Sequence, residues 1–233
     1  MIDQQDSREF VGAFVTAVRP AEPRSRPGRW MLMAAISVVF AVAVASLLNG
    51  AISPAVTTVT EIAGPGCGNG AASFTTAGYY AGAVSNSDDW TTSQTGGYRG
   101  GGCTGAFVSF PVSGHPDAYD SGRYALWTFR LGADLGKKAP CLMWTYIPDV
   151  KELSAVGRSP ARYFVYGIAY VSGSTAQPVG SFELDQANNR GKWVPDGSFS
   201  VTGGLASVLL VDAGSPPGAR DVAAQVRITC SAT

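Results

Sequence analysis

Acidic side chains and a single histidine are the residues of this chain that could carry out catalysis. Two pairs of carboxylates, Asp88 with Asp89 and Asp117 with Asp120, have the residue types of a glycosidase acid and base. His115 is the only histidine, it lies in the turn-like stretch SGHPD, and no Gly-x-Ser-x-Gly nucleophile elbow is present. Because acidic residues in glycine- and serine-rich loops are usually solvated turn formers, we predict that the protein is not an enzyme.

Cysteines are the next candidates for chemistry, as metal ligands or as disulfides. The chain has four, at Cys67, Cys103, Cys141 and Cys230. They form no Cys-x-x-Cys motif and His115 has no ligand partner nearby, so we predict no metal site and no cofactor. The acidic pairs could hold Ca²⁺, but no ligand-spacing motif supports this. An even number of cysteines in an oxidising compartment predicts two disulfides, for which three pairings are possible.

Aromatic residues outside the predicted strands are candidates for binding a carbohydrate. Sugar-binding proteins place pyranose rings on exposed aromatic side chains, while polar groups bind the hydroxyls. The alternative for each ring is ordinary packing, because aromatic side chains dominate protein cores. The candidate ligand-binding residues are Tyr79, Tyr80, Trp90, Tyr98 and Tyr119.

Other aromatic residues lie within predicted strands, and we expect these to be core. They are Trp127, Trp144, Tyr146, Phe164 and Tyr170, whereas Trp193 follows a turn and is expected to be structural.

The elements that would position these residues begin with an apolar segment. Residues 30–48 (WMLMAAISVVFAVAVASLL) are uncharged and long enough to cross a hydrocarbon core of about 30 Å as one helix. Arg24, Arg26 and Arg29 precede it and no Lys or Arg follows before Arg99, which predicts a cytoplasmic N-terminus and an extracytoplasmic C-terminal part. A cleaved signal peptide is the alternative, but the polar leader and the apolar segment are both longer than is usual for one.

Domain boundaries follow from this segment. Residues 1–29 form a cytoplasmic leader, in which residues 7–19 are expected to form a short amphipathic helix. That helix could dock onto a membrane protein or the inner leaflet, or it could be a frayed tail. Residues 49–66 resemble a stalk, and residues 67–233 are expected to form one extracytoplasmic domain.

The extracytoplasmic domain is expected to be an antiparallel β-sandwich. Runs rich in Val, Ile, Tyr, Phe and Trp are separated by glycine, proline and asparagine turns at short intervals, as in sandwiches and barrels. No helical periodicity of useful length occurs after residue 67. The clearest predicted strands are 124–131, 141–147, 161–171, 179–184, 192–194, 198–201, 206–212 and 221–230.

The order of several motifs resembles the golvesin C-terminal and xanthan-lyase carbohydrate-binding-like domains. The motifs are WTYIP (144–148), ARYFVY (161–166), ELDQ (183–186), GKW (191–193), DGSF (196–199) and DVAAQVR (221–227). The resemblance extends over about 88–230 if Trp90 and the turn at 96–100 are the family's opening segment. Pro195-Asp196 and residues 223–225 depart from the family pattern. The resemblance implies a jelly-roll-like sandwich and provides no catalytic residues.

The resemblance also implies a disulfide pairing. In the resembling fold, the strand beginning at Cys141 and the strand ending at Cys230 lie side by side and antiparallel. This implies a Cys141–Cys230 disulfide and leaves Cys67 to pair with Cys103.

Charge and composition limit the possible partners. The chain has 17 Lys+Arg and 17 Asp+Glu, so no net charge favours nucleic acid. We predict a membrane-anchored, non-catalytic domain that binds a glycan or another component of a bacterial cell envelope. The alternative is a structural or accessory subunit of a membrane assembly, with contacts through the sandwich and residues 7–19.

Overall fold

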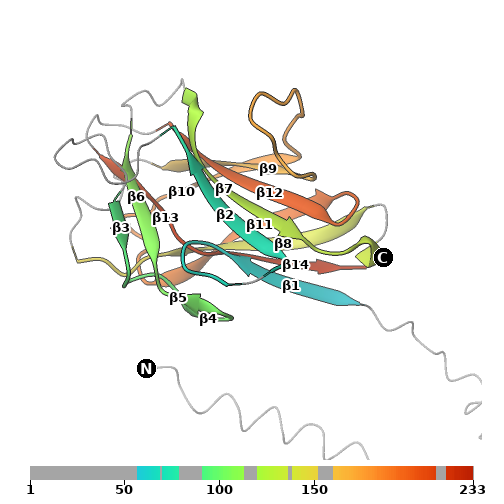
Figure 1. The fold of residues 1–233 in the computed structure, drawn as a ribbon, viewed down its shortest axis with the longest axis horizontal. Coiled ribbons are helices and arrows are strands. Elements are labelled where there is room, and N and C mark those ends of the chain that lie inside the picture. Colours follow the sequence, from blue (N-terminus) through green and yellow to red (C-terminus); the bar gives the residue numbers. More distant parts are fainter. Residues whose placement is uncertain are drawn as a thin grey trace, which may run out of the picture. The chain divides into compact units, whose positions relative to one another are not determined.

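The computed structural model describes residues 57–68, 70–78, 91–112, 120–135, 138–151, 160–213 and 219–232. These residues form antiparallel strands and one short 3₁₀ helix, η1 (Ala133–Leu135), which confirms the all-β prediction (Figure 1). The expected leader and apolar segment, 1–48, lie outside the described residues. Within the described ranges, no helix is long and apolar enough to cross a membrane.

Two larger sheets and two smaller ones make up the domain (Figure 1). The four-stranded sheet has the order β1 (Thr58–Ala63), β14 (Val226–Ser231), β8 (Ala139–Ile147) and β11 (Lys192–Val201). The five-stranded sheet has the order β10 (Gly180–Leu184), β9 (Ala161–Tyr166), β12 (Leu205–Asp212), β7 (Asp120–Arg130) and β2 (Ala72–Ala77). The smaller sheets are β13 (Arg220–Ala223), β6 (Phe107–Pro111) and β3 (Thr91–Ser93), and β4 (Arg99–Gly100) with β5 (Cys103–Thr104).

The core lies between the inward faces of the two larger sheets. Met143 and Ile228 contribute to it from the four-stranded sheet, and Trp127, Tyr163 and Leu210 from the five-stranded sheet, all at most 1% exposed. Burial of each such side chain stabilises the fold by about 1.5–3 kcal/mol. The smaller sheet β13-β6-β3 adds buried residues to the same core.

Two disulfides hold the domain together, as the cysteine count predicts. Cys141 in β8 and Cys230 in β14 lie directly opposite each other in the antiparallel register and are bonded. Cys67 is bonded to Cys103 in β5, which ties the segment after β1 to the glycine-rich β4–β5 turn. The chain-entropy model assigns about 3–5 kcal/mol to disulfides that close loops of these lengths.

The expectation that Trp144 and Tyr146 lie in the core is wrong. Side chains alternate between the faces of a strand, and Cys141, Met143 and Thr145 of β8 all point inward. Trp144 and Tyr146 therefore lie on the outer face of the four-stranded sheet, where both are half-buried. Trp127 is fully buried, as expected.

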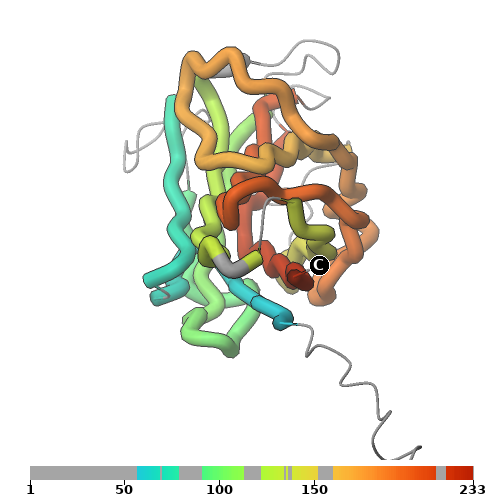
Figure 2. The backbone as a smooth tube through the Cα atoms, turned by 90° about the vertical axis from the view of Figure 1, so that its right-hand side faces the viewer, coloured from blue at the N-terminus to red at the C-terminus, as the bar shows by residue number. Residues whose placement is uncertain are grey.

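Phe164 and Tyr170 also lie outside the main core. Phe164 is on the outer face of β9, and Tyr170 belongs to the loop at 167–179, which leaves the five-stranded sheet between β9 and β10 (Figure 2). The Tyr170 backbone N–H donates to Ser207 Oγ (2.9 Å), and the Tyr170 ring packs edge-on against Tyr124. The loop thus covers a second, smaller apolar cluster on this sheet.

Several strand boundaries differ from the prediction. β1 lies within the range expected to be a stalk and pairs with β14, so the sandwich begins before Cys67. β11 is one strand that continues through a bulge between Pro195 and Gly197, where two strands were predicted. The predicted strand 221–230 is interrupted at Ala224 and Gln225. The Ala224 carbonyl and the Gln225 side-chain amide bond to segments outside the ladder.

Two aspartates are buried with unusual pKa values. Burial, and then the nearby charge of Asp212, raise the pKa of Asp221 from 3.8 to about 8. Burial raises the pKa of Asp196 to about 7, against a hydrogen bond from Thr145 Oγ1 (2.8 Å) that lowers it. Asp221 Oδ2 and Asp196 Oδ1 have no hydrogen-bond partner among the described residues. Both carboxyl groups are therefore held in their neutral forms below pH 7.

The free energy of unfolding is expected to fall as the pH rises from about 4 to about 8. The unfolded chain releases the protons of Asp196 and Asp221 near pH 3.8, whereas the folded state holds them until about pH 7 and 8. Stability present below pH 4 is thus lost progressively as the pH rises through this window. Urea denaturation at pH 4, 6 and 8 measures the loss.

Asp221→Asn is expected to flatten this dependence, because its neutral amide has no proton to lose. The matched control is Asp185→Asn, at an exposed aspartate in the turn after β10. If the free energy of unfolding of the Asp221 variant still fell with pH as in the unchanged protein, this carboxyl group would not be the cause of the pH dependence.

Candidate functional site

The described residues include one of the five predicted ligand-binding aromatics, Tyr98. Tyr98 follows the loop after β3 and is half-buried. Its ring lies 4.9 Å from that of Trp193 and 5.8 Å from that of Tyr146, measured between centroids. The other four lie outside the described residues: Tyr79, Tyr80, Trp90 and Tyr119.

Tyr98 belongs to a group of side chains on the outer face of the four-stranded sheet, which we call the aromatic cluster. Trp193 of β11 lies opposite Tyr146 of β8 in the register, and their rings meet edge to face at 5.4 Å. Trp144 lies on the same face of β8 as Tyr146, and the inward-facing Thr145 lies between them in the strand. The aromatic cluster is Tyr98, Trp144, Tyr146 and Trp193, together with Arg227 of β14.

Arg227 provides the charge of the aromatic cluster. It lies directly opposite Trp144 in the β14–β8 register. Its guanidinium carbon lies 4.6 Å from the ring centroid of Trp144 and 4.7 Å from that of Trp193. Such cation–π contacts stabilise the arrangement by about 0.5–1 kcal/mol each at exposed sites. The face therefore combines apolar rings with a guanidinium, a fixed set of hydrogen-bond donors.

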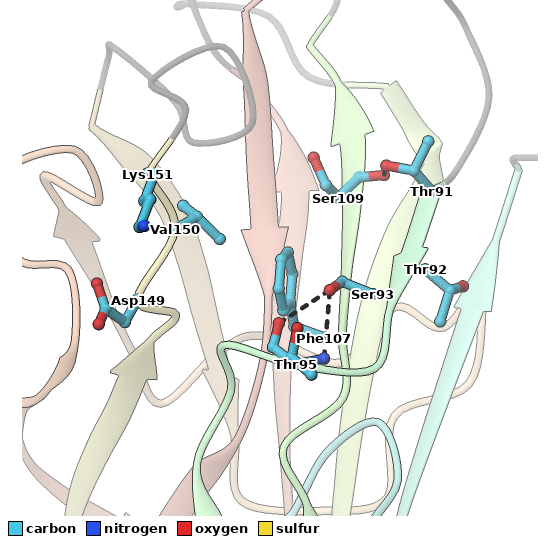
Figure 3. A pocket seen from close by; sticks show the side chains of 9 residues that line it. All are labelled: Thr91, Thr92, Ser93, Thr95, Phe107, Ser109, Asp149, Val150 and Lys151. Atoms are coloured by element: carbon cyan, nitrogen blue, oxygen red, sulfur yellow. Dashed lines mark hydrogen bonds between the residues drawn. The ribbon is translucent and has the colours of Figure 1, made fainter.

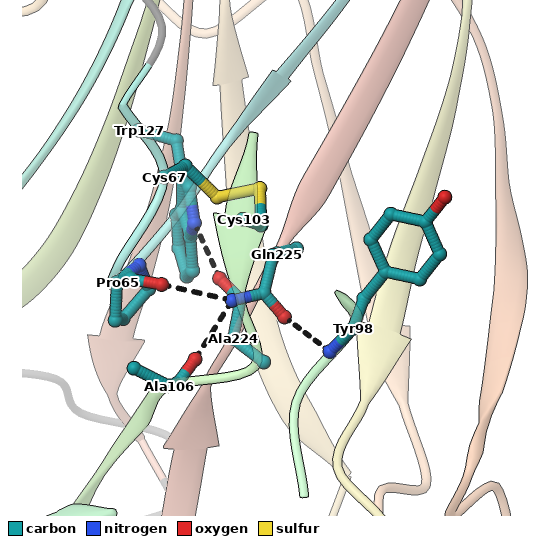
Figure 4. Close-up of a disulfide and its surroundings, with 8 residues drawn as sticks. All are labelled: Pro65, Cys67, Tyr98, Cys103, Ala106, Trp127, Ala224 and Gln225. Carbon is teal, nitrogen blue, oxygen red and sulfur yellow. Dashed lines mark hydrogen bonds between the residues drawn. A yellow bond between two sulfur atoms is a disulfide. The ribbon is translucent and has the colours of Figure 1, made fainter. Parts of the chain in front are cut away.

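A buried glutamine positions Tyr98 (Figure 4). Gln225 Oε1 accepts a hydrogen bond from the Tyr98 backbone N–H (2.7 Å), and Gln225 Nε2 donates to the carbonyls of Pro65 (3.0 Å) and Ala106 (2.7 Å). A Cβ on Gly97 would lie 2.9 Å from Gln225 Oε1 and 2.8 Å from Ala106 O, so only glycine fits beside this amide. The Cys67–Cys103 disulfide lies next to it in Figure 4.

A cavity of about 380 Å³ opens close to Gly96, two residues before Tyr98 of the aromatic cluster. Figure 3 shows the residues that line it. It lies between the strands β3 and β6 and the segment 149–151, which follows β8. Phe107 and Val150 provide its apolar surface. Its volume is within the range of about 300–1,000 Å³ that is usual for small-molecule sites. Its polar lining includes Thr91, Ser93, Thr95, Ser109, Asp149 and Lys151.

Hydrogen bonds to backbone carbonyls hold the segment 149–151 at one wall of this pocket. The Asp149 N–H donates to Gly96 O (2.8 Å), and Arg190 Nη1 donates to Val150 O (2.9 Å). Gly96 has φ +108°, and a Cβ there would lie 3.0 Å from Asp149 O and 3.2 Å from the Phe107 ring. Glycine at this position thus lets the two walls approach each other.

The opposite wall is held by an arginine from β13. Arg220 Nε donates to Ser109 Oγ (2.9 Å), and Arg220 Nη2 donates to Thr91 Oγ1 (3.2 Å). These bonds connect β13, β6 and β3 at the hydroxyl-lined side of the pocket.

Asp149 lies between the pocket and the aromatic cluster. Asp149 is one of the lining residues of the pocket, and its charge also acts on Tyr146. Burial, and then the charge of Asp149, raise the pKa of Tyr146 above 10.0. One residue therefore belongs to both parts of the site.

The two described carboxyl groups with strongly raised pKa values lie away from the pocket. Asp196 and Asp221 have the raised pKa values that active sites use. Asp221 is enclosed by the core, Asp196 is partly buried at the bulge of β11, and neither lines the pocket. Within the described ranges, no three His, Cys, Asp or Glu residues are placed to hold a metal ion. His115, Asp88, Asp89 and Asp117 lie outside these ranges, and of Asp120 only the backbone is described.

Sequence reasoning missed most of the site. Trp144 and Tyr146 could have been found from Cys141, because a disulfide that faces the core places alternate residues of the same strand outside. No local signal connects Ser93, Thr95 and Val150, which come together only through the packing of β3 beside the end of β8.

Fold and site together define an all-β, disulfide-bonded domain with a polar pocket beside an aromatic cluster. No protein-family model and no curated protein matches the chain. Among solved structures it is similar to the K1 cleaved adhesin domain of Lys-gingipain from Porphyromonas gingivalis W83, with 11% identity and a TM-score of 0.38 over 75% of this chain and 97% of that one. The K3 domain of the same protein has 10% identity and a TM-score of 0.31, over 68% and 98%. Likenesses of this degree do not identify a ligand.

Gln225→Leu is expected to lower the free energy of unfolding by about 3 kcal/mol or more. The variant leaves the Tyr98 N–H and the carbonyls of Pro65 and Ala106 without their buried partner, at about 1–3 kcal/mol each. Urea denaturation measures the loss, and amide hydrogen exchange is expected to increase at 97–106. Gln177→Leu, at an exposed glutamine, is the matched control. Equal stabilities of the two variants would contradict this role.

Proposed function

We propose that this domain is a non-catalytic binding module that recognises a glycan through the aromatic cluster. The observation that supports this most is the position of Tyr98, Trp144, Tyr146 and Trp193 on the outer face of a sheet. The rings of Tyr98, Tyr146 and Trp193 contact one another, and Arg227 connects Trp144 to Trp193. All four rings are half-buried, although the core of the same domain is filled by other residues.

The chemistry of the cluster suits a sugar. Pyranose rings have apolar C–H faces, which pack on aromatic rings, and hydroxyls at their edges, which need donors and acceptors. Arg227 supplies donors, and the Tyr146 hydroxyl supplies one more. The golvesin-like motif order, which implies a carbohydrate-binding-like domain, supports the same proposal.

Attachment to the cell membrane is part of the proposal. Residues 30–48 would cross the bilayer as one helix with the N-terminus in the cytoplasm, which leaves the sandwich outside the cell. Two disulfides and no free cysteine support an oxidising compartment. Docking of residues 7–19 onto a membrane protein stays a prediction.

Trp144→Ala and Trp193→Ala are each expected to weaken glycan binding about tenfold, as truncation of a central aromatic contact usually does. The probe is retention of the full-length chain, in detergent, on insoluble peptidoglycan, chitin and cellulose. Tyr170→Ala, at an aromatic residue of the five-stranded sheet's loop, is the matched control and is expected to bind normally. Thermal denaturation confirms that each variant is folded. Failure of all three polymers to retain the chain, or full retention of both tryptophan variants, would overturn the proposal.

Protease added to intact cells is expected to digest the C-terminal domain and spare a tag at the N-terminus. Cys67, Cys103, Cys141 and Cys230 are expected to react with maleimide only after reduction. A protected C-terminal domain with free thiols would show that the orientation is reversed.

A further inference from the structure

The pocket beside the aromatic cluster has an apolar floor within polar walls (Figure 3). Phe107 forms part of this floor but is only 4% exposed, so it offers little more than a ring edge. Val150 is half-buried and lies near it, with Gly96 packed against both. An apolar surface this small fits a methyl group better than the whole face of a sugar ring.

The polar walls are fixed before any ligand binds. Ser93 Oγ donates to Thr95 O (2.8 Å) and accepts from the Thr95 N–H (3.3 Å), which holds the loop above Phe107. Thr91 and Ser109 are held by Arg220 on the far side. Little ordering of this wall is therefore needed on binding.

Asp149 and Lys151 provide the charged groups of the pocket. Both side chains are exposed, and neither forms an ion pair with another described residue. A carboxylate accepts hydrogen bonds from amide N–H and hydroxyl groups, and an ammonium group donates to carbonyl oxygens. Their charges are opposite, so the pair does not favour a ligand with a net charge.

We propose that this pocket binds a 2-acetamido sugar residue. The acetamido methyl group contacts Val150 and the edge of Phe107, its N–H donates to Asp149, and its carbonyl oxygen accepts from Lys151. The ring hydroxyls bond to the hydroxyl-lined wall. This inference rests on the proposed function and adds to it the class of sugar that is recognised.

The pocket and the aromatic cluster then act on one ligand. Asp149 lines the pocket and also acts on Tyr146, so the two sites are adjacent through this residue. A glycan that packs on the aromatic cluster can place one acetamido sugar in the pocket. The cluster supplies affinity for sugar rings in general, and the pocket distinguishes acetamido sugars from plain hexoses.

Calorimetric titration of the full-length chain in detergent tests the proposal with two oligosaccharides. Chitotetraose and cellotetraose have the same length and linkage and differ at C2, where one has an acetamido group and the other a hydroxyl. Chitotetraose is expected to bind at least tenfold more tightly. Equal affinities, or a preference for cellotetraose, would overturn the inference and leave the proposed function standing. Absence of binding by both would overturn the inference, and retention on the insoluble polymers decides the proposed function separately.

Two variants locate the preference in the pocket. Val150→Ser removes apolar surface from the floor and is expected to weaken chitotetraose binding about tenfold, with cellotetraose unchanged. Val171→Ser, at a 67% exposed valine of the 167–179 loop, is its matched control. Lys151→Ala is expected to cause the same selective loss without disturbing the fold, because Lys151 is exposed; Lys138→Ala is its control. A preference that survives both pocket variants would show that the acetamido group binds elsewhere.

Discussion

The end of the sandwich that carries the candidate site depends on the hydrogen bonds of the Gln225 side-chain amide. It bonds at once to the segment after β1, to the loop that presents Tyr98 and to the segment before β6. These backbone groups are buried beside the core, so each needs a partner inside the protein. Gln225 can provide it because the ladder is interrupted between β13 and β14, and the Trp127 indole N–H bonds to the neighbouring Ala224 carbonyl (2.8 Å). The break in the strand is thus what allows the loop before β4 to be fixed.

The Cys141–Cys230 disulfide and the alternation of β8 decide which aromatics face the core. With Cys141 and Met143 inward, Trp144 and Tyr146 must face outward, since one residue of register shift would reverse every side chain of the strand. The aromatic cluster is therefore a consequence of the same register that forms the core. Arg227 lies opposite Trp144 for the same reason, because β14 is held in register with β8 by the disulfide.

The buried carboxyl groups make the stability of the domain depend on pH. Asp196 lies in the bulge of β11, between Trp193 on the outer face and Phe199, which packs against the core. Asp221 lies in β13, next to Val222, whose N–H and carbonyl are both bonded to the buried amide of Gln186. Both carboxyl groups are retained in the neutral form at a cost that increases with pH. The bulge re-aims the chain so that Trp193 and Phe199 lie on opposite faces of the sheet.

The sequence alone determined the all-β class, the two disulfides and the main strands, because alternating apolar residues and turn residues are local signals. It did not reveal β1 to β6. Most of these strands are short and polar, and β1, β2 and β6 pair with strands that are distant in the sequence. Of the site, it identified Tyr98 but not its neighbours. Only the tertiary structure decided that Tyr98 lies on Trp193, that Gln225 anchors it and that Val150 lines a pocket with Phe107. Those contacts join residues far apart in the chain, and strand register and buried hydrogen bonds, rather than local composition, bring them together.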